Sequence, residues 1–195
     1  MTVAFVLGNG VSRSGLPLLH IQKLGKIYGC NALYREFTPD VLVATDRHIA
    51  TQIQENGYAV KHRFYTRKPI EGLGAHRIPR EYYGFSSGPN AVAVAAADQA
   101  HKIYMLGFDL GPSVHNKFNN IYAGTEFYKT VDSPPTFTGN WVRQLTTITK
   151  DFPDVQFVRV CSNTTARLPE LDKLKNLQHE DLDTFVMRIN NQKDL

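Results

Sequence analysis

The chain has 195 residues, 42% of them hydrophobic and 21% charged, which excludes a disordered protein and predicts one sizeable core. Its 22 Lys and Arg against 18 Asp and Glu give a formal net charge of +4, which suits a small phosphorylated ligand as well as nucleic acid. No apolar run reaches the roughly 20 residues of a membrane span, and the first residues, MTVAFVLGNG, lack the basic region of a signal peptide. The two cysteines are too few for a disulfide framework, so we expect a single soluble, cytoplasmic domain over residues 1–195.

Short apolar runs, most of which stop at glycine, asparagine or aspartate, predict buried β-strands. The runs are apolar throughout instead of alternating with polar residues, which is typical of strands covered on both faces. In chain order the predicted strands are Val3–Leu7, Lys26–Tyr28, Val41–Ala44, Ala59–Tyr65, Ile103–Leu106 and Val155–Val160.

Helices are predicted between these strands. One begins after Thr45 or Asp46 and runs to Asn56, with Gly57 as its stop, and an alanine-rich one covers Pro89–His101 with Ser87 as a candidate N-cap. Further helices are expected at Trp141–Lys150 and, one or two of them, within Leu171–Asn190. Alternating strands and helices predict an α/β fold with a mostly parallel sheet.

Two long segments, 67–83 and 110–139, interrupt this rhythm with glycine, proline and asparagine. Irregular segments of this length are often lids or binding loops, and we expect that role for both. Residues 190–195 are expected to be frayed.

Ligands of open parallel sheets bind at the carboxyl ends of the strands. After the first strand, Gly8-Asn9-Gly10 would let backbone N–H groups approach a phosphate or a ribose, although a plain turn explains it equally well. Asn31 follows the second strand, and Ser86-Ser87-Gly88 opens the alanine-rich helix, where hydroxyls suit either an anion or simple capping. Asp109 ends a later strand and is a candidate for ribose binding, for base catalysis or for capping a loop.

Histidine and basic residues add further candidates. His115 lies in the irregular segment after Asp109 and is the best-placed titratable base, although most loop histidines are idle. No spacing of His, Cys or acidic residues predicts a metal site. Cys161 ends a strand and is expected to be a small buried residue. The densest basic cluster, interleaved with aromatic residues, is compatible with single-stranded nucleic acid, a phosphate clamp or a solvated face; it comprises Arg63, Arg67, Lys68, Arg77 and Arg80.

Taken in order, these segments resemble the small bacterial sialyltransferases. The resemblance lies in Gly8-Asn9-Gly10, Cys30-Asn31, the SSG that opens the AVAVAAADQA helix, KIYMLGFD (Lys102–Asp109) and VRVCSN (Val158–Asn163). The first part of the chain is also similar to the related 6-hydroxymethylpterin pyrophosphokinase-like group. The resemblance covers residues 1–110 and the strand near residue 160, and the order of the motifs is more specific than any one of them.

The resemblance implies a Rossmann-like three-layer sandwich that uses a sugar donor of the cytidine monophosphate–sialic acid type, without metal or other cofactor. It implies that Asn9 and Gly10 contact the phosphate or ribose, that Asn31 lies near the donor, and that Ser87 and Gly88 hold the cytidine. It also implies a tyrosine pair that stabilises the leaving phosphate and a histidine that serves as general base on the acceptor hydroxyl.

The chain departs from the family at these last residues. Leu110-Gly111 stand where a tyrosine follows the aspartate in the family, and the stretch SPPTFTGNW before the next helix has no histidine. By analogy Tyr122 and Tyr128 replace the tyrosine pair. His115 becomes the candidate base by elimination, because no other histidine lies between Asp109 and the C-terminal region.

Three functions stay open at this point. The first is a metal-independent, glycosyltransferase-like enzyme that transfers a sugar from a nucleotide sugar to a glycan or another acceptor. The second is a non-catalytic nucleotide-binding or interaction module that uses the segment from Arg63 to Tyr83 for a partner. The third is a magnesium-dependent, diphosphokinase-like phosphotransferase, which would need an acidic pair near Asp109 or Asp46. The modest charge favours a small anionic ligand over a nucleic-acid polymer, and the oligomeric state stays open, a homo-oligomer included.

Overall fold

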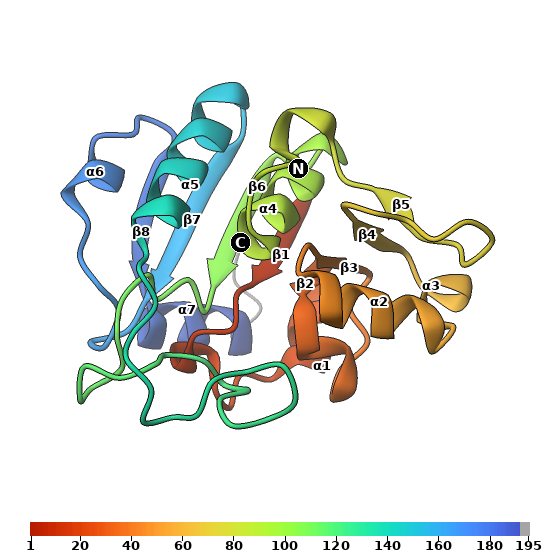
Figure 1. The fold of residues 1–195 in the computed structure, drawn as a ribbon. Helices are drawn as coiled ribbons and strands as arrows, with labels where there is room; N and C mark the ends of the chain where they lie inside the picture. Colours follow the sequence, from red (N-terminus) through yellow and green to blue (C-terminus); the bar gives the residue numbers. More distant parts are fainter. Residues whose placement is uncertain (192–195) are drawn as a thin grey trace.

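The computed structural model describes residues 1–191, which form an α/β fold around one eight-stranded sheet. Every neighbouring pair of strands is parallel, in the order β5-β4-β3-β2-β1-β6-β7-β8 (Figure 1). The strands are β1 (Val3–Leu7), β2 (Lys26–Cys30), β3 (Val41–Ala44), β4 (Phe64–Thr66), β5 (His76–Arg77), β6 (Lys102–Leu106), β7 (Gln156–Cys161) and β8 (Leu177–Asp181).

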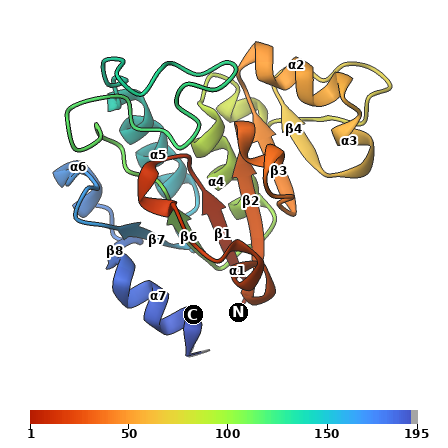
Figure 2. The same cartoon turned by 90° about the horizontal axis from the view of Figure 1, so that it is seen from below.

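Helices cover both faces of the sheet and make the expected Rossmann-like three-layer sandwich (Figures 1 and 2). One face carries α4 (Ser87–Ala97), α5 (Gly139–Asp151) and α6 (Pro169–Asp172). The other carries α1 (Leu18–Leu24), α2 (Arg47–Glu55), α3 (Tyr58–Lys61) and α7 (Leu182–Asn190). Three short 3₁₀ helices complete the described elements: η1 (Val11–Arg13), η2 (Asn31–Arg35) and η3 (Arg80–Tyr82).

The central strand β1 shows why the strands are apolar throughout. Its side chains alternate, so that Ala4 and Val6 pack under α4, while Phe5 and Leu7 pack on the opposite face. Both cores are buried, and Phe5 stacks on Tyr104 with ring centroids 5.5 Å apart. This confirms the expectation of a sheet covered on both sides.

The chain order reverses at β1. Strands β2 to β5 extend from one of its edges, whereas β6 to β8 extend from the other. The connections that leave β1 and β6 therefore diverge, and a crevice forms between them at the carboxyl edge. The segment from Leu110 to Thr138 contains no helix or strand, as expected, and it runs across this edge (Figures 1 and 2).

One predicted strand is wrong, and the edge strand β8 was not predicted. The segment Ala59–Tyr65 does not form one strand, because a single helical turn, α3, precedes the short strand β4. Gly57 has a φ of +73°, which turns the chain so that Ala59 enters the core while Val60 stays exposed. The segment Leu171–Asn190 contains a helix as predicted, α7, but strand β8 precedes it and was not predicted; only Leu177 of this edge strand is buried, so the strand has no apolar run.

Smaller differences concern the limits of elements. Helix α4 begins at Ser87 with Ser86 as its N-cap residue, and it ends at Ala97. Helix α1, strand β5 and η3 were not predicted, and the last two lie inside the segment 67–83 that was expected to be irregular. Of the residues expected to fray, Asn190 ends α7, and residues 192–195 lie outside the described residues.

Within residues 1–191, no helix has the length and apolar character needed to cross a membrane.

Candidate functional site

A pocket of about 130 Å³ lies at the carboxyl ends of β1, β2 and β6, beside the N-terminus of α4. Six of the residues singled out from the sequence line it: Asn9, Gly10, Asn31, Ser87, Gly88 and Asp109. Segments up to 100 residues apart in the chain therefore meet where the strand order reverses, which is the usual ligand position in such sheets.

Glycines bring the loops after β1 and β6 into direct backbone contact. A Cβ on Gly8 would lie 2.6 Å from the carbonyl oxygen of Gly107, and a Cβ on Gly107 would lie 2.7 Å from that of Gly8. Gly8 and Gly10 donate from their backbone N–H groups to Leu106 (2.8 Å) and Gly107 (2.9 Å). The two loops thus form one floor for the pocket, and side chains at these positions would separate them.

Asp109 stabilises this floor by accepting hydrogen bonds. Its buried carboxylate accepts hydrogen bonds from the backbone N–H and hydroxyl of Ser12 and from the amide of Asn119. Gly10 packs so closely against it that a Cβ there would lie 2.5 Å from Asp109 Cγ. Of the three roles proposed from the sequence, these contacts fit a carboxylate that holds the loop Gly10–Ser12 in place.

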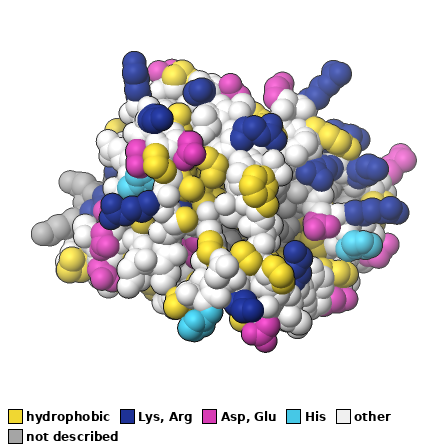
Figure 3. Space-filling model, turned by 60° about the vertical axis from the view of Figure 1, so that its left-hand side comes forward, with side chains coloured by type: hydrophobic (Ala, Val, Ile, Leu, Met, Phe, Trp, Pro, Cys, Tyr) yellow, Lys and Arg dark blue, Asp and Glu magenta, His cyan; other side chains and the backbone are white. Residues whose placement is uncertain are grey.

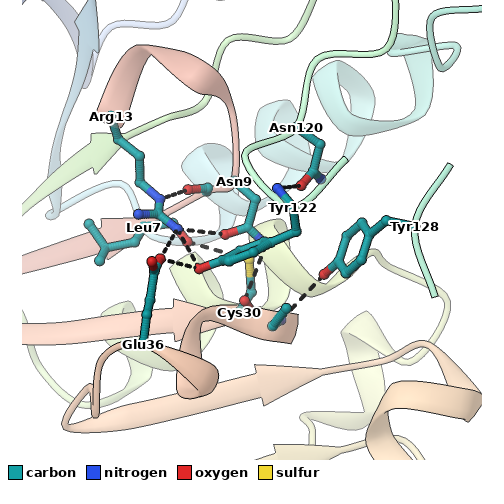
Figure 4. Close-up of polar contacts among 10 residues, drawn as sticks. Leu7, Asn9, Arg13, Cys30, Glu36, Asn120, Tyr122 and Tyr128 are labelled. Carbon is teal, nitrogen blue, oxygen red and sulfur yellow. Dashed lines mark hydrogen bonds and ion pairs between the residues drawn. The ribbon is translucent and has the colours of Figure 1, made fainter. Parts of the chain in front are cut away.

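Asn9 links the first loop to β2. Its amide nitrogen donates to the carbonyl oxygen of Cys30 (3.2 Å), and its amide oxygen accepts from Arg13 Nη2 (3.2 Å) (Figure 4). Arg13 is only 4% exposed and also donates from Nε to the carbonyl oxygen of Gly8 (2.7 Å). The side chain of Asn9 is therefore held from two sides, and burial raises the pKa of the Cys30 thiol beside it to about 12.

Asn31, Ser87 and Thr45 form a second link, across the mouth of the pocket. Ser87 Oγ donates to Asn31 Oδ1 (2.8 Å) and accepts from the backbone N–H of Thr45 (2.9 Å). Asn31 adopts a left-handed conformation with a φ of +53°, a region in which asparagine is tolerated better than most residues. Ser87 thus joins α4 to the ends of β2 and β3 instead of capping its own helix.

The N-terminus of α4 is fixed by α5. Trp141 Nε1 donates to Ser86 Oγ (2.9 Å), and Gln144 Oε1 accepts from the backbone N–H of Ser86 (2.9 Å). The N–H groups of the first helical turn have no acceptors within the helix, and they carry the positive end of its dipole. Trp141 also lines the pocket, which places an aromatic ring beside these donors.

A larger hollow of about 650 Å³ adjoins the pocket and shares with it Asn31, Ser86, Ser87 and Trp141. It extends over the ends of β3 and β4, and its charged lining consists of Arg47, Arg67, Lys68 and Asp46. Arg67 donates to the carbonyl oxygens of Tyr83 (2.8 Å) and Phe85 (2.8 Å), so its charge is held in place without a carboxylate. We call the pocket and this hollow together the carboxyl-edge groove.

The predicted basic cluster does not act as one patch. Arg67 and Lys68 line the groove, whereas Arg63 donates to Asp98 in a bidentate ion pair (2.6 and 2.8 Å). The face drawn in Figure 3 presents basic and acidic side chains interspersed, without a continuous basic stripe among the described residues of that face.

Tyr122 and Tyr128 lie behind the pocket, with their rings 5.7 Å apart. Tyr122 OH donates to Glu36 Oε1 (2.5 Å) and accepts from Arg13 Nη2 (3.0 Å), while Tyr128 OH accepts from the backbone N–H of Ala32 (3.3 Å) (Figure 4). Burial raises the pKa of both hydroxyls above the ordinary value for tyrosine. The structure brings the two tyrosines together, but neither lines the groove.

His115 is exposed in the turn Ser113–Lys117 and lines neither part of the groove.

Four residues that hold or line the site were not predicted from the sequence: Arg13, Thr45, Asn119 and Trp141. Thr45 directly follows a predicted strand, so its position carried a usable signal; the other three depend on contacts between distant segments. Cys161 is half-buried, not buried as expected.

Residues 1–191 contain no cluster of three or more His, Cys, Asp or Glu side chains placed to hold a metal ion. In comparisons with protein-family models, with curated proteins and with solved structures, nothing matches this chain.

Proposed function

We propose that the chain binds a nucleotide sugar of the cytidine monophosphate–sialic acid type in the carboxyl-edge groove and transfers the sugar to an acceptor. The observation that carries the proposal is the convergence of Asn9, Gly10, Asn31, Ser87 and Gly88 on one pocket that opens into a basic hollow. A donor of this type combines an uncharged base with two anionic groups, the phosphate and the sugar carboxylate. A pocket lined mainly by uncharged polar residues, whose carboxylate, Asp109, is already bonded to Ser12 and Asn119, suits that pattern when it lies beside a basic hollow.

In this proposal the phosphate lies at the junction of pocket and hollow, next to Ser86 and Ser87. The first-turn N–H groups of α4 then stabilise the negative charge that the phosphate gains as its bond to the sugar breaks. The ribose lies over Gly10, where a side chain would already clash with Asp109, and the cytosine lies against Gly88 and Trp141. Arg67 and Lys68 attract the sugar carboxylate.

Transfer requires an acceptor hydroxyl to attack the sugar carbon that carries the phosphate, while cytidine monophosphate leaves and a base takes the hydroxyl proton. His115 remains the candidate base, and it would reach the groove only if the segment 110–138 moved over the bound donor. Tyr122 and Tyr128 support this proposal indirectly, because they hold Glu36, Arg13 and the start of η2 behind Asn9 and Asn31.

A matched pair of glycine variants tests the binding site. Gly88→Ala adds a methyl group that meets only Phe108, at 3.4 Å, so the fold is kept; because Gly88 lines the pocket, the methyl group is placed to collide with a ligand there. Gly84→Ala adds the same group in open space at a residue that does not line the groove, and it is the control. Calorimetric titration with cytidine monophosphate should show affinity lowered about tenfold or more by Gly88→Ala and unchanged by Gly84→Ala. Equal affinities in the two variants would contradict the proposed site.

A specific observation also favours a nucleotide-binding module without transfer. The carboxylate of Asp109 and the hydroxyls of Tyr122 and Tyr128 are engaged within the protein, and His115 lies outside the groove. Release of cytidine monophosphate from the sugar donor separates the two functions. Transfer that falls about 100-fold in His115→Gln, with unchanged nucleotide affinity, supports the enzyme. Binding without any transfer supports the module, and binding of adenosine triphosphate only with Mg²⁺ supports the phosphotransferase.

A further inference from the structure

A cavity of about 480 Å³ lies at the other end of the same sheet edge, between the ends of β7 and β8, the loop 162–168 and α6. It is separate from the carboxyl-edge groove and has no lining residue in common with it. Its volume is in the range of small-molecule sites. Three of its lining residues, Cys161, His179 and Asp172, lie in contact with one another.

The sheet register brings the thiol and the imidazole together. Arg159 and Cys161 are two residues apart on β7 and share a face, and His179 of β8 is paired with Arg159. His179 is therefore the diagonal neighbour of Cys161, and Cys161 Sγ lies 3.7 Å from His179 Nδ1. Asp172 of α6 approaches from above the sheet, with Oδ1 2.8 Å from His179 Nε2.

This order of atoms has a chemical consequence. In a neutral imidazole whose Nε2–H donates a hydrogen bond to Asp172, Nδ1 carries the lone pair, and this lone pair is directed at the Cys161 thiol. A nucleophile, a base and a group that orients the base are thus connected in sequence, which is the arrangement that activates a cysteine or serine for covalent catalysis.

We infer that Cys161, His179 and Asp172 form a second reactive centre, in which Cys161 accepts an acyl group from a thioester or an activated ester. His179 Nδ1 takes the thiol proton while Sγ forms a bond to the carbonyl carbon. The tetrahedral intermediate then expels the thiolate or alkoxide, which takes the proton from His179. The products are an acyl group on Cys161 and a free thiol or alcohol, and water activated by His179 can release the acid and restore the thiol.

The surroundings are compatible with this role. Burial raises the pKa of Cys161, and burial followed by the charge of Arg159 lowers that of His179, so the resting pair is a neutral thiol and a neutral imidazole. Arg159 itself is fully buried and donates to the carbonyl oxygens of Phe108, Ala166 and Asp109, each at 2.9 Å, which holds the cavity wall. Cys161 Sγ also lies 3.5 Å from the carbonyl oxygen of Arg159, the contact that a purely structural thiol would use.

The test uses p-nitrophenyl acetate, with release of p-nitrophenol followed optically and the acetylated residue identified by mass spectrometry. The chain offers a clean background, because its other cysteine, Cys30, is buried. We expect one acetyl group on Cys161 in the wild type and none at this position in Cys161→Ala. The rate of acetylation should fall about 100-fold in His179→Gln and about tenfold in Asp172→Ala.

His76→Gln is the matched control, since His76 is an exposed histidine on β5 at the opposite edge of the sheet. Should His179→Gln unfold, Asp172→Ala keeps the test valid, because the Asp172 side chain is 59% exposed. Acetylation of Cys161 at the same rate in wild type, His179→Gln and Asp172→Ala would overturn the inference, as would a wild-type chain in which Cys161 carries no acetyl group.

The pH dependence of the acetylation rate separates a thiol that is assisted by His179 from a merely structural one. The wild-type acetylation rate should rise with pH as His179 loses its proton. This rise should occur at a pH below the ordinary pKa of histidine, and it should be absent in His179→Gln. The charged groups near the pair are Arg159 from β7, Asp172 from α6, Arg167 from the loop, Asp181 from β8 and Asp109 from the loop after β6, whereas Glu180 pairs with Arg188 on the other face of the sheet. A wild-type profile that follows only the thiolate of Cys161 would count against the inference.

Discussion

Arg13 is the residue on which the first loop of the site depends. Its guanidinium contacts the carbonyl oxygen of Gly8, the side chain of Asn9 and the hydroxyl of Tyr122, and it lies 3.7 Å from Glu36. Each N–H group of a buried cation needs a hydrogen-bond acceptor in place of water, because a buried charged donor without one costs folding free energy. Asn9 and Tyr122 are therefore part of one polar cluster, and the shape of the pocket floor follows from it.

Removing a single hydroxyl from this cluster tests its importance. Tyr122→Phe takes one acceptor from Arg13 and one donor from Glu36, and we expect the free energy of unfolding to fall by about 1–3 kcal/mol. Tyr128→Phe removes only the acceptor for the N–H of Ala32, at 3.3 Å, and should cost less than about 1 kcal/mol. Urea denaturation of the two variants and the wild type measures both values, and equal losses would show that Arg13 does not rely on Tyr122.

At the scale of elements, the carboxyl end of α4 is attached to the sheet through Asp98. This C-cap residue accepts two hydrogen bonds from Arg63, next to β4, and one from Tyr28 OH of β2 (2.8 Å). Burial by itself would raise the pKa of Asp98, but the hydrogen bonds from Arg63 and Tyr28 outweigh it and hold the pKa below its ordinary value. One carboxylate thus fixes the helix whose other end forms the candidate site.

The sign of this shift predicts how stability depends on pH. Because the pKa of Asp98 is lower in the folded than in the unfolded chain, its contribution is present above the unfolded value of about 3.9 and is lost as the pH falls through the folded value. Asp98→Asn should lower the free energy of unfolding by about 1.5–3 kcal/mol at pH 7. The difference from wild type should persist to about pH 5 and shrink below about pH 4. Denaturant titrations across this range measure it, and a constant difference down to the lowest pH would contradict the assignment.

For the molecule as a whole, the carboxyl edge of the sheet holds both the proposed nucleotide groove and the Cys161 cavity, on opposite sides of β6. If the groove binds only the folded chain, ligand at 100 times its dissociation constant adds about 2.7 kcal/mol to stability. For a chain of this size that corresponds to a rise in melting temperature of about 5–10 °C.

Thermal denaturation with cytidine monophosphate measures this rise. It should be the same in the wild type, Gly84→Ala and Cys161→Ser, and it should be smaller in Gly88→Ala at the same ligand concentration. A loss of the rise in Cys161→Ser would mean that the two sites are coupled, contrary to their separate linings.

Local patterns were sufficient to predict most of the fold. The strands at Val3–Leu7 and Val41–Ala44 are confirmed at both ends, because buried parallel strands are short apolar runs that stop at turn residues. Parallel strands end at one edge, which is why Asn9 and Asn31 were expected there, and both line one pocket together with Ser87 from the start of α4. The failures at α3 and β8 come from segments whose structure depends on neighbours: a turn set by Gly57, and an edge strand set by β7.

The sequence by itself therefore determined the central strands of the sheet, its two covered faces and the small polar residues at its carboxyl edge, since all of these follow from local hydrophobicity and turn chemistry. Only the tertiary structure decided which side chains face one another. The Arg13, Tyr122 and Glu36 cluster joins three distant segments, and the Cys161, His179 and Asp172 set depends on the register of β7 with β8. Strand β8 has only one buried residue, so its own hydrophobic pattern does not specify its register, which depends on the packing of β7, β8 and the helices together.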